Sequence, residues 1–227
     1  IFQFLLGNPS NFMNNDPNNH PLNMLGTIYK GGIIVPIIQT LLLTVLALSI
    51  ERYFALRSAF GKGSLSKFVA NIKDALAAGD MKKAQEICDK QRGSVANVVT
   101  STLRKYEEME KNTSLPKEQK LLAIQKELEE ATDLEMPMMQ QNLPIIATIT
   151  TLGTLMGLLG TVIGMIRSFA ALSAGGGADS MALSQGISEA LINTAFGILT
   201  GALAVISYNY YTNKIDKLTY GLEEVGF

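Results

Sequence analysis

Three long runs without a formal charge limit what this chain can fold into. No Asp, Glu, Lys or Arg occurs in Gly31–Ile50, Met136–Ile166 or Ala190–Asn213. A helix needs about twenty residues to cross a hydrocarbon core of about 30 Å, so each run is long enough to span a membrane. A buried helix of a soluble protein can mimic one such run, but three of them predict an all-α membrane protein. The expected transmembrane helices are 31–50, 143–167 and 189–211.

The composition agrees with contact between the chain and lipid. Hydrophobic residues make up 47% of the chain and charged residues 17%, and there is no Trp. The net charge of −1 gives no basic field for DNA or RNA, so we expect no nucleic-acid partner. Cys88 is the only cysteine, which excludes an internal disulfide and favours a reduced structural thiol.

The Lys and Arg residues set the predicted orientation. None occurs in residues 1–29, whereas Arg52 and Arg57 follow the first span and Lys214 and Lys217 follow the third. Because such residues collect on the cytoplasmic side, we expect the amino end and the hairpin between the second and third spans to lie outside. The predicted outside parts are 1–30 and 168–188, and the predicted cytoplasmic parts are 51–142 and 212–227.

The large cytoplasmic loop has the pattern of a helical domain into which long helices extend. Ser64 and Asp80 are expected to cap two amphipathic helices, and Gly79 is expected to end the first of them. Further along, apolar residues at near-heptad spacing predict a long helix that leads straight into the second span. Pro137 and Pro144 are expected to bend that helix.

The second predicted span carries a stripe of small and hydroxylated side chains. The stripe includes Thr150, Thr154 and Thr161 on one helical face. Tight helix packing explains the glycines of this span, whereas the repeated hydroxyls favour a polar or wet lumen. The glycines form two GxxxG pairs, which let backbones approach closely in lipid. These are Gly153, Gly157, Gly160 and Gly164.

The third predicted span also has a polar face. Glu189, Asn193 and Thr200 recur there at spacings of four and seven. A carboxylate that faces lipid is costly, so we expect Glu189 to face protein or water. A second interpretation of Glu189 is a carboxylate at the helix start, stabilised by the helix dipole. The adjoining face holds Thr194, Gly197 and Gly201.

Few ionisable residues accompany these spans. Arg167, at the outer end of the second span, is expected to anchor the helix at the interface or to pair with Asp179 or Glu189. No Asp, Lys or His lies at mid-depth in the predicted spans. Proton transport through a membrane needs an ionisable relay, so a partner must supply that group.

The sequence lacks the signatures of an enzyme. His20 is the single histidine and lies in an Asn/Pro-rich stretch, which excludes a His-based triad and a multi-His metal site. No phosphate-binding fingerprint occurs, and Gly175–Gly177 is expected to be an outer turn. We therefore expect no catalysis, no cofactor and no bound metal.

Two motifs resemble the MotA/TolQ/ExbB proton channel family. The segments LLGTVIGM at Leu158–Met165 and GISEALINTAFGI at Gly186–Ile198 fall in the second and third spans in the family's order. Glu51-Arg52 after the first span also resembles the family's step out of the membrane. Three spans with the amino end outside are more similar to ExbB and TolQ than to MotA, which has four.

The resemblance implies a homopentamer in the bacterial inner membrane whose second and third spans line a central pore. Two copies of an ExbD/TolR-like partner would lie in that pore, and a membrane Asp of the partner would carry the proton. The family's pore threonines correspond to Thr161 and Thr194, and its pore glutamate corresponds to Glu189. Thr154 stands where relatives often have Pro, which predicts a straighter helix at this point.

The function that the resemblance implies is that of an ExbB-like stator subunit. Driven by the proton motive force, it would energise TonB-dependent transport across the outer membrane together with a TonB-like protein. A TolQ-like role in outer-membrane maintenance is one alternative, and a passive membrane scaffold or self-contained channel is another. In this setting residues 7–30 and 168–188 would be periplasmic.

The first residues of the sequence have the pattern of a helix end. Ile1–Leu6 is apolar, and Gly7–Ser10 has the composition of a helix stop. We expect Ile1–Leu6 to end an additional, peripheral membrane helix; the remnant of a signal peptide and a short interfacial helix are the alternatives. Intact-mass measurement of the native chain tests this expectation. It should reveal about twenty or more further apolar residues, and a native chain that begins at Ile1 would contradict it.

Overall fold

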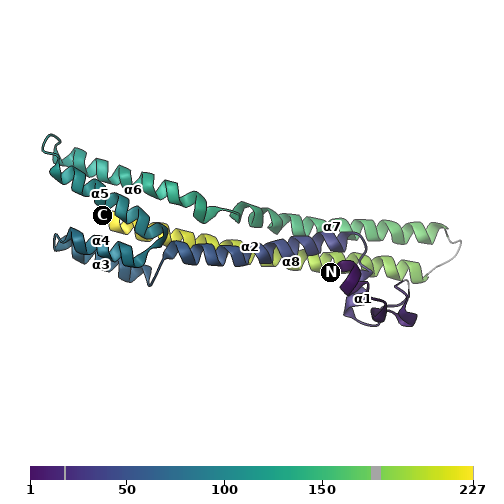
Figure 1. The fold of residues 1–227 in the computed structure, drawn as a ribbon. Coiled ribbons are helices and arrows are strands. Elements are labelled where there is room, and N and C mark those ends of the chain that lie inside the picture. The colour runs from purple at the N-terminus through teal and green to yellow at the C-terminus, as the bar shows by residue number, and fades with distance from the viewer. Residues whose placement is uncertain (18, 175–179, 227) are drawn as a thin grey trace. The chain divides into compact units, whose positions relative to one another are not determined.

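The computed structural model describes residues 1–17, 19–174 and 180–226, and they fold into helices without a β-strand. Three of the described helices are long and apolar enough to cross a membrane, which confirms the predicted fold class (Figure 1). They are α2 (Ile34–Phe60), α7 (Leu143–Ala174) and α8 (Ser180–Gly226). The chain divides into two compact units, Ile1–Leu48 with Ile145–Tyr208 and Ser49–Pro144 with Asn209–Phe227.

The first unit begins with an ordered, Asn-rich segment. Short helical turns at Phe2–Leu6, Pro9–Asn11 and Met13–Asn15 precede α1 (Met24–Tyr29). The buried Asn11 amide donates to the carbonyl oxygens of Leu5 and Leu6 at 2.9 and 3.0 Å, so it satisfies backbone groups that the first turn leaves free. Asn23 in turn donates to Asn11 Oδ1 at 2.9 Å and caps α1. Side-chain amides therefore organise this segment.

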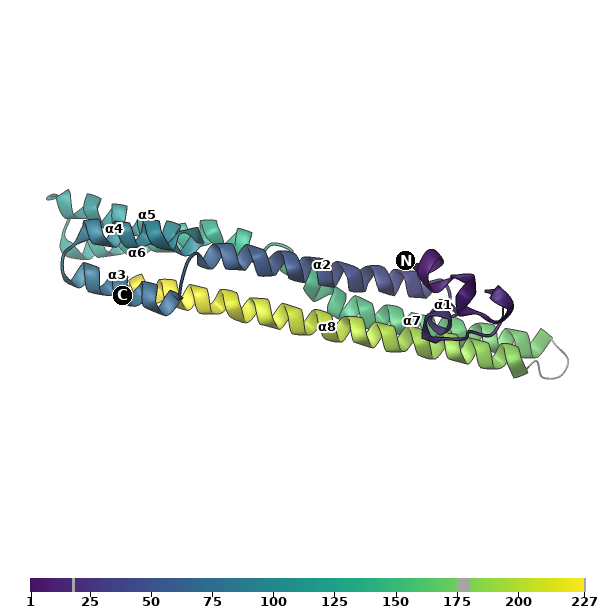
Figure 2. The same cartoon turned by 60° about the horizontal axis from the view of Figure 1, so that its bottom comes forward.

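The rest of the first unit consists of three helical segments that lie side by side (Figures 1 and 2). They are the first part of α2 and the parts of α7 and α8 that carry the second and third apolar runs. Each segment contributes fully or almost fully buried side chains, including Val35 and Ile38 from α2, Ile146 from α7 and Ala204 from α8. This interior places the polar residues of the second and third spans.

The second unit contains four shorter helices together with the ends of α2 and α8 (Figure 2). The short helices are α3 (Leu65–Ala77), α4 (Met81–Gln91), α5 (Gly93–Lys111) and α6 (Lys117–Gln140). The end of α8 contacts α3, because Lys73 Nζ donates to Glu224 Oε1 at 2.9 Å and Leu65 packs on Gly221. The long helix of the third span thus continues into this unit.

The predicted boundary between the first two short helices is confirmed. Gly79 adopts a positive φ of 69°, and its N–H donates to Leu76 O at 2.9 Å as α3 ends. The Asp80 side chain then accepts from the Lys83 N–H at 3.0 Å and caps α4. Ser64 does precede α3, but its side chain makes no capping hydrogen bond.

The expectation of one long helix leading straight into the second span is wrong. α6 ends at Gln140 and α7 begins at Leu143, and Asn142 between them has a positive φ of 65°. Pro144 therefore lies in the first turn of α7, where a missing N–H costs no helical hydrogen bond. Near-heptad periodicity could not show this break, because Asn in a left-handed conformation ends a helix without disturbing the apolar spacing.

A buried arginine holds the end of α6 to α2. Arg52 is 1% exposed, and its Nη1 donates to the Met138 and Met139 carbonyl oxygens at 3.1 and 3.3 Å. Its Nε donates to Glu51 Oε2 at 2.6 Å, and its Nη2 pairs with Glu51 Oε1. Glu51 Oε2 also accepts from Asn142 Nδ2 at 3.3 Å. The Glu51-Arg52 pair therefore satisfies free carbonyls of the last turn of α6 and contacts the break after it.

Removal of this arginine should destabilise the second unit. In Arg52→Ala the two carbonyl oxygens lose a charged donor, so we expect a cost of about 2–3 kcal/mol in the free energy of unfolding. Thermal unfolding followed by circular dichroism in detergent measures it. Arg104→Ala is the control, because that side chain is exposed. Equal unfolding temperatures for the two variants would contradict the role of Arg52.

Candidate functional site

Glycines bring the backbones of α7 and α8 close together in the first unit. A Cβ added to Gly197 would lie 2.7 Å from Gly157 Cα and 2.7 Å from Gly153 O. Gly160 and Gly164 of α7 likewise face residues of α8, and Gly201 of α8 faces Thr150 and Thr154. Helices in lipid associate through close packing because burial of apolar surface gives no net driving force there. These glycines make that packing sterically feasible.

The polar face of α8 is buried in the first unit. Glu189 is 8% exposed, and Asn193 and Thr200 are fully buried. Asn193 Nδ2 donates to Gly31 O at 2.9 Å, and Thr200 Oγ1 donates to Phe196 O at 2.8 Å. Asn193 Oδ1 has no hydrogen-bond partner within the described part of the chain. Where α7 and α8 pack together, the side-chain carbonyl oxygen of Asn193 is therefore a buried acceptor without a donor among the described residues, and such an unpaired polar atom is costly.

The threonines of the second and third spans lie in less buried positions. Thr150, Thr161 and Thr194 are half-buried, and Thr154 is exposed. Three of the hydroxyls donate to carbonyl oxygens of their own helix, Thr150 to Ala147, Thr154 to Thr150 and Thr161 to Leu158. Thr194 Oγ1 instead donates across to Gly157 O of α7 at 3.4 Å. Each hydroxyl oxygen keeps acceptor capacity toward water or a neighbouring molecule.

Arg167 pairs with Glu189, one of the two acids expected as its partner. Arg167 Nη1 donates to Glu189 Oε1 at 2.8 Å, with the arginine half-exposed and the carboxylate nearly buried. The other expected acid, Asp179, lies outside the described residues, and so does Gly175–Gly177, for which an outer turn was expected. The interpretation of Glu189 as a helix-start carboxylate is wrong, because α8 begins at Ser180 and Glu189 lies in its interior. Its charge is compensated by Arg167.

Gly32 lies against Glu189, a contact that the sequence pattern did not predict. This residue has a positive φ of 75° in the turn before α2, and an added Cβ would collide with Glu189 Oε1. The turn therefore approaches the carboxylate more closely than a side chain allows. The Gly31-Gly32 pair directly before the first span was the available signal, but a glycine pair alone does not show which residue lies against it.

Other candidate chemistry is sparse. Among residues 1–17, 19–174 and 180–226, no group of three or more His, Cys, Asp or Glu side chains is placed to hold a metal ion. Cys88 is a buried free thiol on α4, and burial raises its pKa. The thiolate is therefore disfavoured, as expected for a structural cysteine.

Known proteins that resemble this chain belong to one family. Residues 91–224 match the sequence profile described as the MotA/TolQ/ExbB proton channel family. A Synechocystis protein named biopolymer transport protein ExbB-like 1 is 30% identical over 82% of this chain and 69% of its own length. The Tol-Pal system protein TolQ of Pseudomonas aeruginosa is 24% identical over 80% of this chain and 81% of its own length.

Another match covers less than half of both chains. The Synechocystis protein named ExbB-like 3 is 36% identical over 37% of this chain, and the match covers 41% of that relative. The chain thus spans less than half of the length of this relative.

A methyl group at position 32 should disturb the pair between Glu189 and Arg167. Gly32→Ala combines a left-handed backbone, which costs an alanine about 1–2 kcal/mol, with a collision against Glu189 Oε1. Gly79→Ala is the matched control, because its φ of 69° is similar and nothing lies within 4 Å of the added Cβ. We expect Gly32→Ala to lower the thermal unfolding temperature further than Gly79→Ala. An equal decrease would mean that the contact with Glu189 carries no energy.

Proposed function

Because the chain belongs to the MotA/TolQ/ExbB proton channel family, we propose that it is an ExbB-like stator subunit of a motor driven by the proton motive force. The family and the three apolar helices make it a multi-pass membrane protein of the proton-channel type. In the proposal it resides in the bacterial inner membrane and acts with an ExbD-like partner. Through a TonB-like protein the motor energises transport across the outer membrane.

The buried polar face of α8 is the observation that carries this proposal. Glu189, Asn193 and Thr200 are enclosed between apolar helices, where uncompensated polar groups are expensive. Packing alone is served better by apolar side chains of the same size. Polar residues at this depth are typical of ion and proton pathways. Asn193 Oδ1, which lacks a partner among the described residues, is a natural point for a water molecule in such a pathway.

A partner is needed because this chain has no free acid at mid-depth. Its only carboxylate in the second and third spans is Glu189, which Arg167 already engages. A group that carries a proton across the membrane must lie within it, whereas Glu189 stands at the outer boundary of the predicted third span. We therefore assign the proton-carrying acid to two copies of an ExbD/TolR-like partner. In a homopentamer, Thr161 and Thr194 would line the path of the proton.

The TolQ-like role is the second candidate, and a specific match favours it. The Pseudomonas aeruginosa protein that aligns over 80% of this chain is named Tol-Pal system protein TolQ. The physics of the stator would be the same in both roles, and the partner would differ. Genes next to this one discriminate: an ExbD and TonB pair favours nutrient uptake, whereas TolR, TolA and TolB favour envelope maintenance.

Co-purification from native membranes tests the proposed assembly. The chain should retain an ExbD/TolR-like protein, in a complex of five copies of this chain and two of the partner. Proton flux in liposomes then separates the remaining functions. Flux that needs the partner supports the proposal, flux without a partner indicates a self-contained channel, and the absence of flux with the partner indicates a passive scaffold.

The threonine hydroxyls should matter for that flux. Thr161→Val and Thr194→Val keep the shape of the side chain and remove an oxygen that can hydrogen-bond water along the path. Loss of one such bond, about 1 kcal/mol, should lower the partner-dependent proton flux about fivefold in each variant. Thr151→Val is the control on the same helix, because Thr151 lies off the stripe. Full flux in both variants, with assembly intact, would refute the hydroxyl role.

A further inference from the structure

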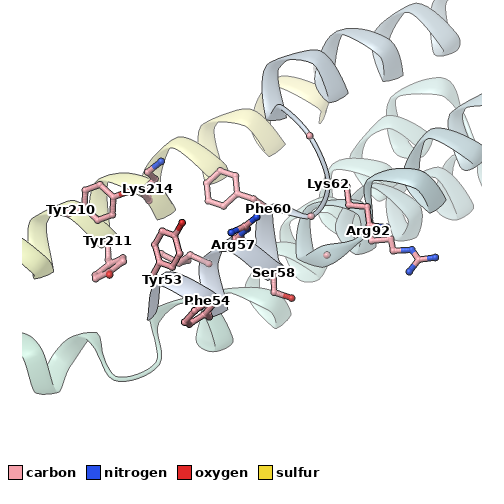
Figure 3. A pocket seen from close by; sticks show the side chains of 14 residues that line it. Tyr53, Phe54, Arg57, Ser58, Phe60, Lys62, Arg92, Tyr210, Tyr211 and Lys214 are labelled. Carbon is pink, nitrogen blue, oxygen red and sulfur yellow. The ribbon is translucent and has the colours of Figure 1, made fainter. Parts of the chain in front are cut away.

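The second unit contains a groove of about 920 Å³ between the end of α2 and the neighbouring part of α8 (Figure 3). Aromatic side chains from both helices line one part of it, Tyr53 and Phe54 from α2 and Tyr210 and Tyr211 from α8. Tyr53 is 48% exposed, Phe54 62% and Tyr210 49%. Rings exposed to this extent leave apolar surface that an occupant or lipid would cover.

The same groove carries positive charge without compensation. Arg57, Lys62, Arg92 and Lys214 line it, and none of its described lining residues is acidic. None of these four side chains forms an ion pair with another described residue. Lys214 Nζ lies 5.6 Å from the centre of the Tyr210 ring, which holds the ammonium group beside the aromatic side chains. The groove therefore suits an anion.

The charged residues differ in how they face the groove. In Figure 3, Arg57 lies near Tyr53 and Phe60 in the middle of the view, whereas the guanidinium of Arg92 points away from the aromatic side chains. Arg57 and Lys214 are thus the cations that share the groove with the rings. A guanidinium can offer two parallel N–H donors to a phosphate, and an ammonium adds a point charge.

The position of the groove along both helices indicates a lipid. On α2 the uncharged run ends at Ile50, shortly before Tyr53, and on α8 it ends at Asn213, directly before Lys214. Both helices therefore pass from apolar to charged sequence beside the groove. Tyrosine rings and the heads of Lys and Arg lie at this depth in membrane proteins, and basic pockets on the cytoplasmic side bind anionic headgroups.

We propose that this groove binds an anionic phospholipid of the cytoplasmic leaflet. Arg57 and Lys214 donate to its phosphate, and Phe54 and Tyr53 lie against its glycerol and the upper part of its acyl chains. A soluble phosphate would satisfy the cations but would leave these rings uncovered. The site does not depend on proton transport by the chain.

Binding of phosphatidylglycerol to the purified full-length chain tests this assignment. In micelles of a neutral detergent, phosphatidylglycerol should be retained in native mass spectra and raise the thermal unfolding temperature, and phosphatidylcholine should do neither. Each of Arg57→Gln and Lys214→Gln should weaken phosphatidylglycerol binding about fivefold. Both side chains are exposed, so the variants should fold.

Three controls make the result decisive. Lys217→Gln removes the same charge from the same helix outside the groove, and it should bind as the unchanged chain does. Arg57→Lys keeps the charge and should bind more tightly than Arg57→Gln. Inorganic phosphate at the same concentration should not stabilise the chain. The proposal is overturned if R57Q and K214Q bind normally, if K217Q loses as much affinity, or if phosphate or phosphatidylcholine stabilises equally. Proton flux is not measured, so failure here leaves the proposed function untouched.

Discussion

The backbones of α7 and α8 meet through glycines, and the polar residues of the first unit take their positions from that contact. Gly157 and Gly197 lie back to back, and Gly160 lies against Asn193 so closely that an added Cβ would be 2.7 Å from Asn193 Cγ. A larger side chain at these places would separate the helices and open the polar face of α8. Because the helices touch, Asn193 is fully buried and reaches Gly31 O instead of lipid.

The basic residues after the first span have different roles in the structure. In the predicted orientation all of them lie on the cytoplasmic side, which Lys and Arg prefer. Arg52 is buried and holds the final turn of α6 through two carbonyl oxygens. Arg57, about one and a half turns later on α2, is exposed and faces the groove, whose described lining residues include no acid. The Glu51-Arg52 step thus has a structural explanation that needs no part in proton transport.

The buried charged side chains have ion-pair partners, whereas the exposed cations of the groove have none among the described residues. Glu189 is nearly buried and has Arg167 at 2.8 Å, and Arg52 is buried beside Glu51. Burial of an ion without a partner costs several kcal/mol. The two pairs therefore make it possible to bury Glu189 and Arg52, rather than adding stability to a fold that would form without them. The exposed cations of the groove carry no such penalty, since water or a lipid headgroup can solvate them.

The three spans, the all-α class and the turn at Gly79-Asp80 could be predicted from the sequence, because apolar run length and capping depend on residues that are neighbours in the chain. The sequence also identified Thr161, Thr194 and Glu189 as polar residues of the spans, but it left two acids possible as the partner of Arg167. Three features emerged only from the folded chain: the break at Asn142, the contact of Gly32 with Glu189 and the burial of Arg52. The break leaves the apolar periodicity unchanged, and the other two join residues far apart in the chain, whose meeting depends on how whole helices pack.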